Sequence, residues 1–355
     1  MRKALSLARR GLGKVHPNPM VGAVLVKRGQ VIGEGFHEFF GGPHAEANAI
    51  QSAHDKAPGS TLVVTLEPCA HYGKTPPCAE LIVRNKVKEV VVGALDPNPL
   101  VSGKGIRFLK KAGLQVSAGI LNKECEALNK DFNFWMRRKM PYVIVKRAQS
   151  LDGKIATKTG ESRWISGEAA RIFSQRLRAE CDAVMVGINT VLRDDPLLSV
   201  RHRRNSPQPI KVILDSHLRV SPKARIFSKD SKGPVILAVT QQASEKRRKL
   251  FQGKAVILEV KEKNGRVSLR ALLSELAKQG VLRVMIEGGG EVIAEAFAEK
   301  LVQEVCVFIA PKIIGGRQAV NAVAGEGIRR LQDALELKEM RFERVGRDLL
   351  IRGRF

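Results

Sequence analysis

Residues 43–46 read PHAE, residues 67–69 read EPC and residues 75–78 read TPPC, and these three segments set the interpretation of the whole chain. Together they supply one imidazole and two thiols, the mixed nitrogen and sulfur donors that zinc prefers. Three protein ligands leave the fourth position of a tetrahedral zinc ion open for water, as in catalytic zinc sites. The predicted ligands are His44, Cys69 and Cys78.

Glu46 follows the histidine by two residues, close enough to move protons to and from a water at the open position without being a ligand itself. A His-x-Glu motif followed by Pro-Cys and a later Cys is the signature of zinc-dependent nucleobase deaminases. A purely structural zinc would need a fourth protein ligand, for which His71 is the nearby candidate. The remaining cysteines have no partner at ligand spacing and are expected to be small buried hydrophobes; they are Cys125, Cys181 and Cys306.

The length and composition suit a two-domain globular protein. The chain has 355 residues, of which 44% are hydrophobic and 27% are charged. No apolar run approaches the roughly eighteen residues that a membrane helix needs, and residues 1–11 lack the apolar centre of a signal peptide. Five cysteines, two of them assigned to a metal, do not support a disulfide framework. We therefore expect a cytoplasmic protein that binds no membrane.

The formal net charge of +26 is the most unusual global property of the chain. Such a charge is compatible with a nucleic acid, an anionic surface or a phosphorylated small molecule as the partner. The basic residues are spread over the whole sequence, and aromatic residues, which stack on bases, make up only 5%. We expect a generally basic surface with anion binding confined to specific sites, and no nucleic-acid partner.

The pattern of the first half predicts an α/β domain with one sheet between helical layers. Prolines in the HPNP segment at 16–19 end the first helix, and a β-branched hairpin is expected around Arg28-Gly29. The next two helices begin near His44 and at Cys78, so that two helix N-termini converge on the metal. The expected elements are a helix at 1–12, strands at 21–27, 30–36, 61–66 and 88–93, a helix from 44 to 54, an α-β unit at 103–118 and a helix at 122–138.

A new alternation of apolar residues begins after Met140-Pro141, where we place a boundary between domains at 1–140 and 141–355. The second domain is again expected to be α/β. Its predicted strands lie at 142–148, 182–187, 210–214, 234–240, 254–260, 281–286 and 303–309, its helices at 166–180, 242–251, 268–279 and 290–300, and two final strands lie around Gly346-Arg347-Asp348.

The chain resembles the family of bifunctional riboflavin-biosynthesis deaminase-reductases over essentially its whole length. The motifs that carry the resemblance are HPNPxVG at 16–22, TLEPCxHxGKTPPC at 65–78 and DPNP at 96–99. The eight residues between Cys69 and Cys78 are the most specific feature, because deaminases that act on cytidine or tRNA typically have two. The departures are small: Gln149 stands where a small residue is common, and the chain starts a few residues late.

The resemblance implies that the first domain has a cytidine-deaminase-like three-layer α/β/α fold and holds one zinc ion. Its reaction would be hydrolytic removal of the 2-amino group from 2,5-diamino-6-(5-phosphoribosylamino)pyrimidin-4(3H)-one, with Glu46 as acid and base in turn. Of the implied contacts, Asn18 and Asn98 could instead shape turns, and His37 could instead cap its strand. The residues implied to hold this substrate are Asn18, His37, His71, Lys74 and Asn98.

The second half contains a polar loop at the end of a predicted strand, KRAQSLDGKIAT at 146–157, followed by GESRWIS at 160–166. Such loops at strand C-termini are where open α/β sheets bind ligands. The segment EGGG at 287–290 lies between a strand and a helix, where bare amides can receive a phosphate. By itself this glycine turn is weak evidence, because it lacks the spacing of a Rossmann fingerprint.

The resemblance implies that this half has a dihydrofolate-reductase-like fold and uses NADPH to reduce the ribosyl group of the deaminated product to ribityl, with Lys146 as a proton source. Plainer interpretations stay open: Arg178 on a solvated helix face, 194–196 as a turn, and Trp164 in the core. The implied cofactor contacts are Ala148, Trp164, Thr190, Asp194, Ser216, Gly289 and Gly290, and the implied substrate contacts are Lys146, Ser162, Arg178, Leu198, Arg201 and Glu287.

Two rival functions remain at this stage. A nucleic-acid deaminase would explain the charge but leaves the reductase motifs unexplained, and it predicts binding that weakens steeply with salt. Alternatively, the second half is a non-catalytic binding or oligomerisation module, which failure to bind NADPH would favour. The family implies a homo-oligomer, a dimer or tetramer, acting on a small phosphoribosyl-pyrimidine; neither the oligomeric state nor the preference for NADPH over NADH can be read from the residues.

Overall fold

The protein is described here by a computed structural model that covers residues 1–72, 76–99, 101–201 and 206–355. The chain divides into two compact units, Met1–Lys139 and Met140–Phe355. Within the described ranges, no helix is both long enough and apolar enough to cross a membrane.

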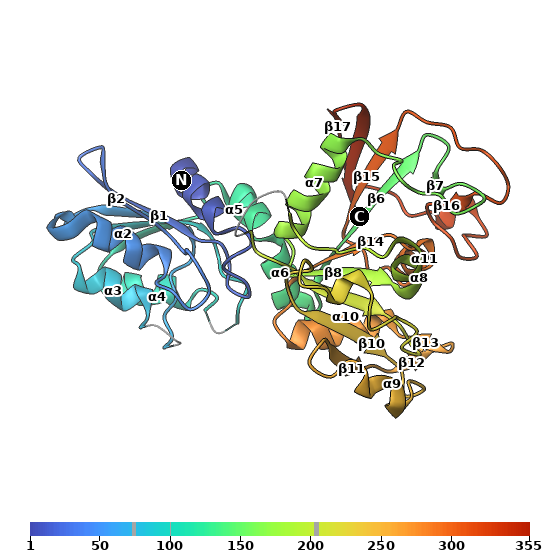
Figure 1. Cartoon of the computed structure of the whole chain (residues 1–355). Helices are drawn as coiled ribbons and strands as arrows, with labels where there is room; N and C mark the ends of the chain where they lie inside the picture. Colours follow the sequence, from blue (N-terminus) through green and yellow to red (C-terminus); the bar gives the residue numbers. More distant parts are fainter. Residues whose placement is uncertain (73–75, 100, 202–205) are drawn as a thin grey trace. The chain divides into compact units, whose positions relative to one another are not determined.

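The first unit contains one five-stranded sheet in the order β2-β1-β3-β4-β5 (Figure 1). Strand β1 runs antiparallel to both of its neighbours, whereas β3, β4 and β5 are parallel. The β1–β2 hairpin turns at Arg28 and Gly29, both in the left-handed region, as a two-residue hairpin turn requires. The strands are β1 (Gly22–Lys27), β2 (Gln30–Phe36), β3 (Thr61–Leu66), β4 (Glu89–Ala94) and β5 (Gln115–Ala118).

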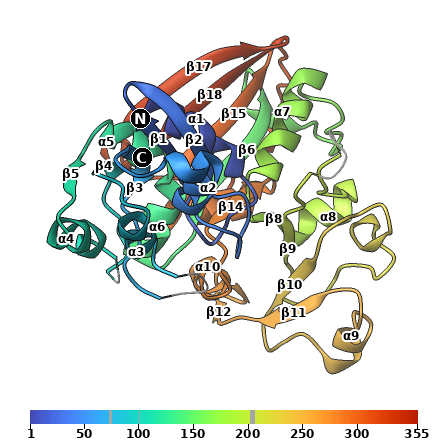
Figure 2. The same ribbon diagram turned by 90° about the vertical axis from the view of Figure 1, so that its left-hand side faces the viewer.

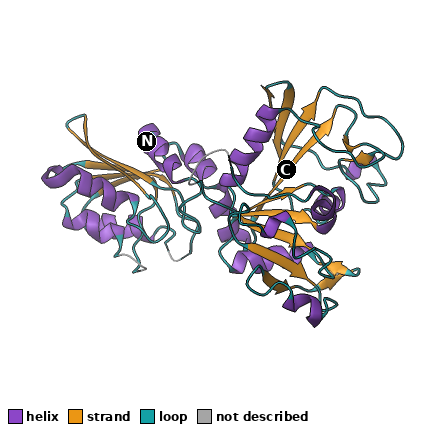
Figure 3. Ribbon diagram, viewed as in Figure 1, coloured by secondary structure: helices purple, strands orange, loops and turns teal. Residues whose placement is uncertain are grey.

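Helices cover both faces of this sheet, as the sequence predicted (Figure 3). The α2, α3 and α4 side buries an alanine-rich core, and α2 lies so close to β2 that a Cβ on Gly35 would stand 2.3 Å from the backbone nitrogen of Ala49. The other face packs against α1 and α5. The helices are α1 (Arg2–Ala8), α2 (Ala45–Ala53), α3 (Cys78–Arg84), α4 (Lys104–Lys111), α5 (Asn122–Leu128) and α6 (Lys130–Arg138).

The single helix predicted at 122–138 is wrong, because the chain breaks at Asn129 into α5 and α6. The Asn129 side chain accepts a hydrogen bond from the backbone nitrogen of Met20 at 2.8 Å and donates one to the carbonyl of Met20 at 2.9 Å. The buried carboxylate of Asp131, two residues later, lies 3.3 Å from Nε2 of His16. The break therefore ties the C-terminal helices of the unit to the HPNP segment.

The second unit contains a nine-stranded sheet in the order β11-β10-β9-β8-β14-β6-β15-β18-β17. The strands from β11 to β15 in this order are parallel, and β18 and β17 are antiparallel. The strands are β6 (Tyr142–Ser150), β8 (Ala183–Gly187), β9 (Ile210–Leu214), β10 (Val235–Val239), β11 (Val256–Glu259), β14 (Arg283–Glu287), β15 (Glu304–Ala310), β17 (Glu339–Val345) and β18 (Asp348–Arg354).

Helices also pack on both faces of the second sheet. Phe173 of α7 meets Phe308 of β15 edge to face on one side, and α10 and α11 cover the apolar core on the other. The sequence did not predict α8 or the two short ribbons β7–β16 and β12–β13. The helices are α7 (Glu168–Ala179), α8 (Ile188–Asp194), α9 (Glu245–Lys249), α10 (Leu269–Lys278) and α11 (Gly290–Ala298), and the short strands are β7 (Lys154–Ala156), β12 (Glu262–Lys263), β13 (Arg266–Val267) and β16 (Val320–Asn321).

Candidate active sites

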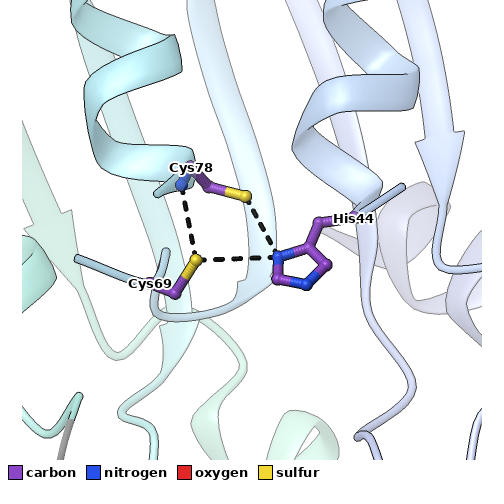
Figure 4. Close-up of side chains that lie close together, drawn as sticks. All are labelled: His44, Cys69 and Cys78. Carbon is purple, nitrogen blue, oxygen red and sulfur yellow. Dashed lines mark hydrogen bonds between the residues drawn. The ribbon is translucent and has the colours of Figure 1, made fainter. Parts of the chain in front are cut away.

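The three predicted metal ligands converge in the first unit (Figure 4). His44 is the N-cap residue of α2, Cys78 is the first residue of α3, and Cys69 lies in the loop after β3. The Nδ1 atom of His44 is 3.2 Å from Sγ of Cys78 and 3.6 Å from Sγ of Cys69. The starts of α2 and α3 therefore lie beside one another at a single small space.

This donor set fits a zinc ion. The three ligand atoms all lie within 4.8 Å of one another. In a tetrahedral zinc site with bonds of 2.0 to 2.3 Å, ligand atoms stand roughly 3.5 Å apart, which the distances around His44 match. Among the residues that the structure places, His71 is not part of this cluster. The arrangement therefore offers three candidate protein ligands, the number typical of a catalytic site, and does not favour a four-ligand structural site.

The surroundings of Cys69 favour its thiolate form. A hydrogen bond from the thiol of Cys78, another from His44 and the backbone N–H of Cys78 at 3.3 Å all lower the pKa of Cys69 against the effect of burial. Cys78 opens α3, so the positive end of that helix also lies at the pair. A thiolate is the form that binds a metal ion.

Glu46 lies in the first turn of α2 and is buried, with only 3% of its surface exposed. Burial raises the pKa of its carboxyl group to about 7, although His44 opposes the shift. Its carboxylate also interacts with the thiol of Cys78. A buried carboxyl group beside the metal ligands, with a pKa near neutrality, is suited to both take up and release a proton.

Asn18 and His37 meet beside the metal ligands. Their side chains lie 3.0 Å apart, Nδ2 to Nε2, and the His37 ring packs edge-on against the His44 ring at 5.5 Å. The Pro43 carbonyl, 2.9 Å from Nδ1 of His37, can only accept, so Nδ1 carries the proton and Nε2 accepts from the Asn18 amide. Burial lowers the pKa of His37, which keeps the ring neutral. These contacts join the HPNP segment to the candidate metal site. His37 therefore does more than cap the end of its strand.

The structure shows fewer interactions for the other three residues predicted to contact the substrate, His71, Lys74 and Asn98. His71 has a buried Nδ1 without a hydrogen-bond partner in the described part of the chain. Lys74 falls outside the described residues. The backbone of Asn98 donates to the carboxylate of Asp96 at 2.8 Å, so the DPNP segment does contain an Asx turn, with Asp96 as its leading residue.

Sequence reasoning missed Glu67, which precedes the Pro68-Cys69 pair. Its buried carboxylate accepts hydrogen bonds from the backbone nitrogens of Gly103 at 2.9 Å, Ile106 at 3.2 Å and Asp96 at 3.4 Å. One side chain thus holds the DPNP turn and the start of α4 against the loop of a metal ligand. In the sequence, the sign of this role was that Glu67 lies in the EPC segment that contains the predicted ligand Cys69.

The second unit contains a cavity of about 1260 Å³. This exceeds the usual range of about 300 to 1,000 Å³ for a single small-molecule site and suits a site that holds a cofactor and a substrate together. Every predicted reductase residue lines it: Lys146, Ala148, Ser162, Trp164, Arg178, Thr190, Asp194, Leu198, Arg201, Ser216, Glu287, Gly289 and Gly290.

Three charged groups form the floor of this cavity. Arg178 of α7 and Glu287 at the end of β14 make a close ion pair, with Nη2 2.6 Å from Oε2 and Nε 3.2 Å from Oε1. Arg178 is therefore not on a solvated face. Burial lowers the pKa of Lys146, and Glu287 opposes that shift. Burial alone would raise the pKa of Glu287, but Arg178 and Lys146 outweigh it and leave the carboxylate ionised.

The rim of the cavity is built from loops. Trp164 is 61% exposed, with the guanidinium of Arg171 4.4 Å from its ring centre, so it is not a core residue. Ser162 donates to the carboxylate of Asp194 at 3.3 Å. The turn interpretation of 194–196 is also correct in part, because Asp195 ends α8 in the left-handed conformation. Residues 194–196 therefore form a turn and also line the cavity.

The glycine segment at the end of β14 fits the phosphates of a dinucleotide. Gly288 and Gly289 have φ values of 70° and 80°, and a Cβ on Gly289 would stand 3.3 Å from the hydroxyl of Thr190. Gly289 is the N-cap residue of α11, so this helix directs its free backbone amides at the space that a side chain would fill. The residues present therefore fit an anionic cofactor.

A buried lysine that the sequence did not single out supports the wall of the cavity. Lys211 of β9 is fully buried and donates to the carbonyl of Ser231 at 3.0 Å and to its hydroxyl at 2.6 Å. The Ser231 hydroxyl donates in turn to the carbonyl of Leu197 at 3.1 Å. The next residue, Leu198, lines the cavity in a left-handed conformation. Nothing in the pattern around Lys211 signalled this network.

Comparison with known proteins gives matches over both units. Residues 141–351 match the family model of the RibD C-terminal domain, and residues 1–94 match the cytidine and deoxycytidylate deaminase zinc-binding region. The chain is 41% identical to riboflavin biosynthesis protein RibD of Actinobacillus pleuropneumoniae, over 99% of this chain and 93% of that one. It is 42% identical to RibD of Aquifex aeolicus, over 99% and 96%.

Solved structures agree with these matches. The structure of Acinetobacter baumannii RibD is similar with a TM-score of 0.89 at 39% identity, covering 99% of this chain and 97% of that one. A Thermotoga maritima protein described as a diaminohydroxyphosphoribosylaminopyrimidine deaminase/5-amino-6-(5-phosphoribosylamino)uracil reductase is similar with a TM-score of 0.87 at 36% identity, covering 100% and 97%. The expected pair of folds, cytidine-deaminase-like and reductase-like, is confirmed by these matches.

Proposed function

The chain belongs to the RibD family of riboflavin-biosynthesis enzymes, and from this premise we propose how its two sites divide the work of a deaminase and reductase. We assign residues 1–140 to deamination of 2,5-diamino-6-(5-phosphoribosylamino)pyrimidin-4(3H)-one. Residues 141–355 then reduce the ribosyl group of the product, 5-amino-6-(5-phosphoribosylamino)uracil, to ribityl. The observation that carries the deaminase assignment is the cluster of His44, Cys69 and Cys78 with the buried Glu46 beside it.

In the deaminase site, His44, Cys69 and Cys78 would hold one zinc ion, whose Lewis acidity activates a water for attack on the amino-bearing ring carbon. Glu46 accepts the proton that the water gives up and passes it to the ring nitrogen. It then takes the remaining proton of the hydroxyl group added to that carbon and gives it to the amino group, which leaves as ammonia while the C=O bond forms. The raised pKa of Glu46 supports both steps, because neither its acid nor its base form is strongly favoured near neutral pH.

The pyrimidine is held by polar groups around the metal ligands. The linked side chains of Asn18 and His37, next to the His44 ring, support a role in orienting the ring of the substrate. The buried Nδ1 of His71 supports a contact with substrate, because it has no partner among the residues described. Lys74 and Asn98 complete the proposed set, with Lys74 suited to the phosphate as a flexible positive charge.

In the reductase site, NADPH bound along the Gly289–Gly290 segment would supply the hydride. The protein brings the sugar to the cofactor and provides a proton to the sugar oxygen, for which Lys146 is the proposed donor. The lowered pKa of Lys146 supports this role, because a less basic ammonium releases its proton more readily. The cofactor contacts proposed are Ala148, Trp164, Thr190, Asp194, Ser216, Gly289 and Gly290, and Ser162, Arg178, Leu198, Arg201 and Glu287 are proposed to hold the substrate.

The cysteines, the cofactor and the family support a compartment and an assembly for the enzyme. The five cysteines form no disulfide, and two of them are proposed metal ligands; this and dependence on a reduced nicotinamide cofactor support a cytoplasmic location. The substrates are small molecules. We assign the enzyme to a homo-oligomer, a dimer or tetramer, as implied by its family.

The test uses purified zinc-loaded protein and the diaminopyrimidine ribotide, with and without NADPH, while ammonia release and the nicotinamide absorbance are followed. We expect ammonia in both samples and NADPH consumption only after deamination. A chelator should abolish ammonia release but leave reduction of added aminouracil ribotide intact. Ammonia alone would make the second unit a binding module, and neither signal would overturn the substrate assignment. Binding of RNA that weakens steeply with salt would then favour the nucleic-acid deaminase.

A further inference from the structure

Strand β17 forms an open edge of the nine-stranded sheet (Figure 2). It pairs with β18 on one side, and no strand of the described residues pairs with it on the other. Residues 339–344 are all exposed, including Phe342 at 73% and Met340 at 59%. In an antiparallel pair, every second residue of the outer strand directs its N–H and C=O away from its neighbour. An exposed edge of seven residues with apolar side chains is a template for pairing with another strand.

Glu339 of β17 pairs with Arg354 of β18 at 3.0 Å, but the two charged residues that flank Phe342 are less well compensated. Arg341 lies opposite Arg352 of β18, and Arg352 is already paired with Glu304 at 2.8 Å. Glu343 lies opposite the buried Leu350. In the described ranges, neither Arg341 nor Glu343 forms an ion pair. Like charges in opposite positions of a sheet are destabilising, so Arg341 would gain from an acidic neighbour on its free side.

The sequence of β17, EMRFERV, is complementary to itself in one antiparallel register. With Phe342 opposite Phe342 of a second copy, Arg341 faces Glu343 twice, once on each side of the two-fold axis. Shifting the axis by one residue either way places Arg341 against Arg341 or Glu343 against Glu343. The charge pattern therefore selects the register centred on Phe342.

We propose that β17 pairs antiparallel with β17 of a second copy of this chain, with Phe342 on the two-fold axis, so that two nine-stranded sheets become continuous. The inference rests on the proposed homo-oligomer and adds its interface. An isologous contact of this kind closes on itself, because each copy has one β17 edge. Residues 339–345 do not line the cavity, so this assembly leaves the reductase machinery untouched.

A cysteine at the axis tests the register. Opposite residues in an antiparallel pair have Cα atoms about 4.5 to 5.5 Å apart, within the range that a disulfide bridges. Mild oxidation of Phe342→Cys should therefore give a covalent dimer on a non-reducing gel. Met340→Cys is the matched control: it is exposed on the same strand, but its two copies would be displaced along the strands by roughly 13 Å, too far to bridge.

Charge reversal tests the interface in solution. The wild type should have at least twice the mass of one 39.0 kDa chain by light scattering. Arg341→Glu and Glu343→Arg should each raise the dimer dissociation constant roughly tenfold or more, because two attractive contacts become repulsive. The double variant should recover wild-type affinity, since opposite charges face each other again.

Three results would each overturn the interface: a monomeric wild type across the concentration series, equal cross-linking of Phe342→Cys and Met340→Cys, or charge reversals without effect on mass. Recovery in the double variant also separates the proposal from a strand of a different protein, which would not carry the compensating change. Ammonia release and NADPH oxidation measured on the same samples report the proposed chemistry separately. A dimer without either activity would sink the function and leave the interface standing.

Discussion

Replacing Lys211 by methionine should change how the stability of the second unit depends on pH. The Lys211 amine is fully buried, and its two acceptors are the carbonyl and hydroxyl of Ser231. No carboxylate forms an ion pair with it among the residues for which coordinates are described. Burial lowers the pKa of Lys211 from 10.5 to about 8. A neutral amine with two N–H donors would satisfy both acceptors without a buried charge.

The direction in which the free energy of unfolding changes with pH follows from how many protons each state binds. The unfolded chain keeps the Lys211 proton until about pH 10.5, whereas the folded chain releases it near pH 8. Between these values the unfolded state binds more protons, so the free energy of unfolding rises with pH. Below pH 8 both states are protonated and the cost of burying the charge is fully present. The full difference is worth roughly 3 kcal/mol, of which about 2 kcal/mol should be regained between pH 7 and pH 9.5.

The assay is urea unfolding followed by circular dichroism at pH 7 and pH 9.5 for the wild type and Lys211→Met. Subtracting the variant removes the titration of all other groups. We expect the wild type to gain about 2 kcal/mol relative to Lys211→Met on going to pH 9.5. Lys232→Met, an exposed neighbour, is the control and should track the wild type. A constant gap between Lys211→Met and the wild type, or one that moves the other way, would refute the reasoning.

Three further predictions concern the two sites. Glu46→Gln should lower deamination by about 10² to 10⁴-fold without changing zinc content by atomic absorption or reduction of added aminouracil ribotide; loss of zinc would instead assign Glu46 a structural role. Glu287→Gln should weaken the contact with Arg178 and raise the KM for reduction roughly tenfold. Because Glu287 raises the pKa of Lys146, the variant should also move the alkaline limb of the pH–rate profile to lower pH. An alkaline limb at the same pH in both proteins would contradict the coupling between Glu287 and Lys146. Glu67→Gln turns one acceptor oxygen into a donor that faces backbone N–H groups, and should cost about 2 kcal/mol in urea unfolding of the first unit; unchanged stability would show that these hydrogen bonds contribute nothing.

Several elements could be predicted because their patterns are local. The strand Thr61–Leu66 was predicted with its exact bounds, since a β-branched apolar run between polar segments has few alternatives. The final hairpin was found from Gly346, which takes φ of 62° in the two-residue turn. The metal ligands were predicted from spacing and donor chemistry, and the structure brings all three together.

The features that were missed depend on partners far away in the sequence. The helix break at Asn129 arises from its two hydrogen bonds to Met20, which no helical pattern in 122–138 could reveal. Glu67 and Lys211 look like ordinary charged residues until burial shows what they hold. Helix propensity and hydrophobic periodicity describe one segment at a time, so contacts over 36 or 109 residues lie beyond their reach.

The division at Lys139 has a consequence for biosynthesis on the ribosome. All three candidate zinc ligands lie in the first 139 residues, which form a compact unit of their own, so we expect this part to fold and bind metal while the rest of the chain is still being translated. At about 5 to 20 residues per second, the remainder takes on the order of 10 to 40 s to emerge. Strand β6 leaves the ribosome first in that remainder, yet its neighbours β14 and β15 are made near the end. We therefore expect β6 to stay without its sheet neighbours for most of that time.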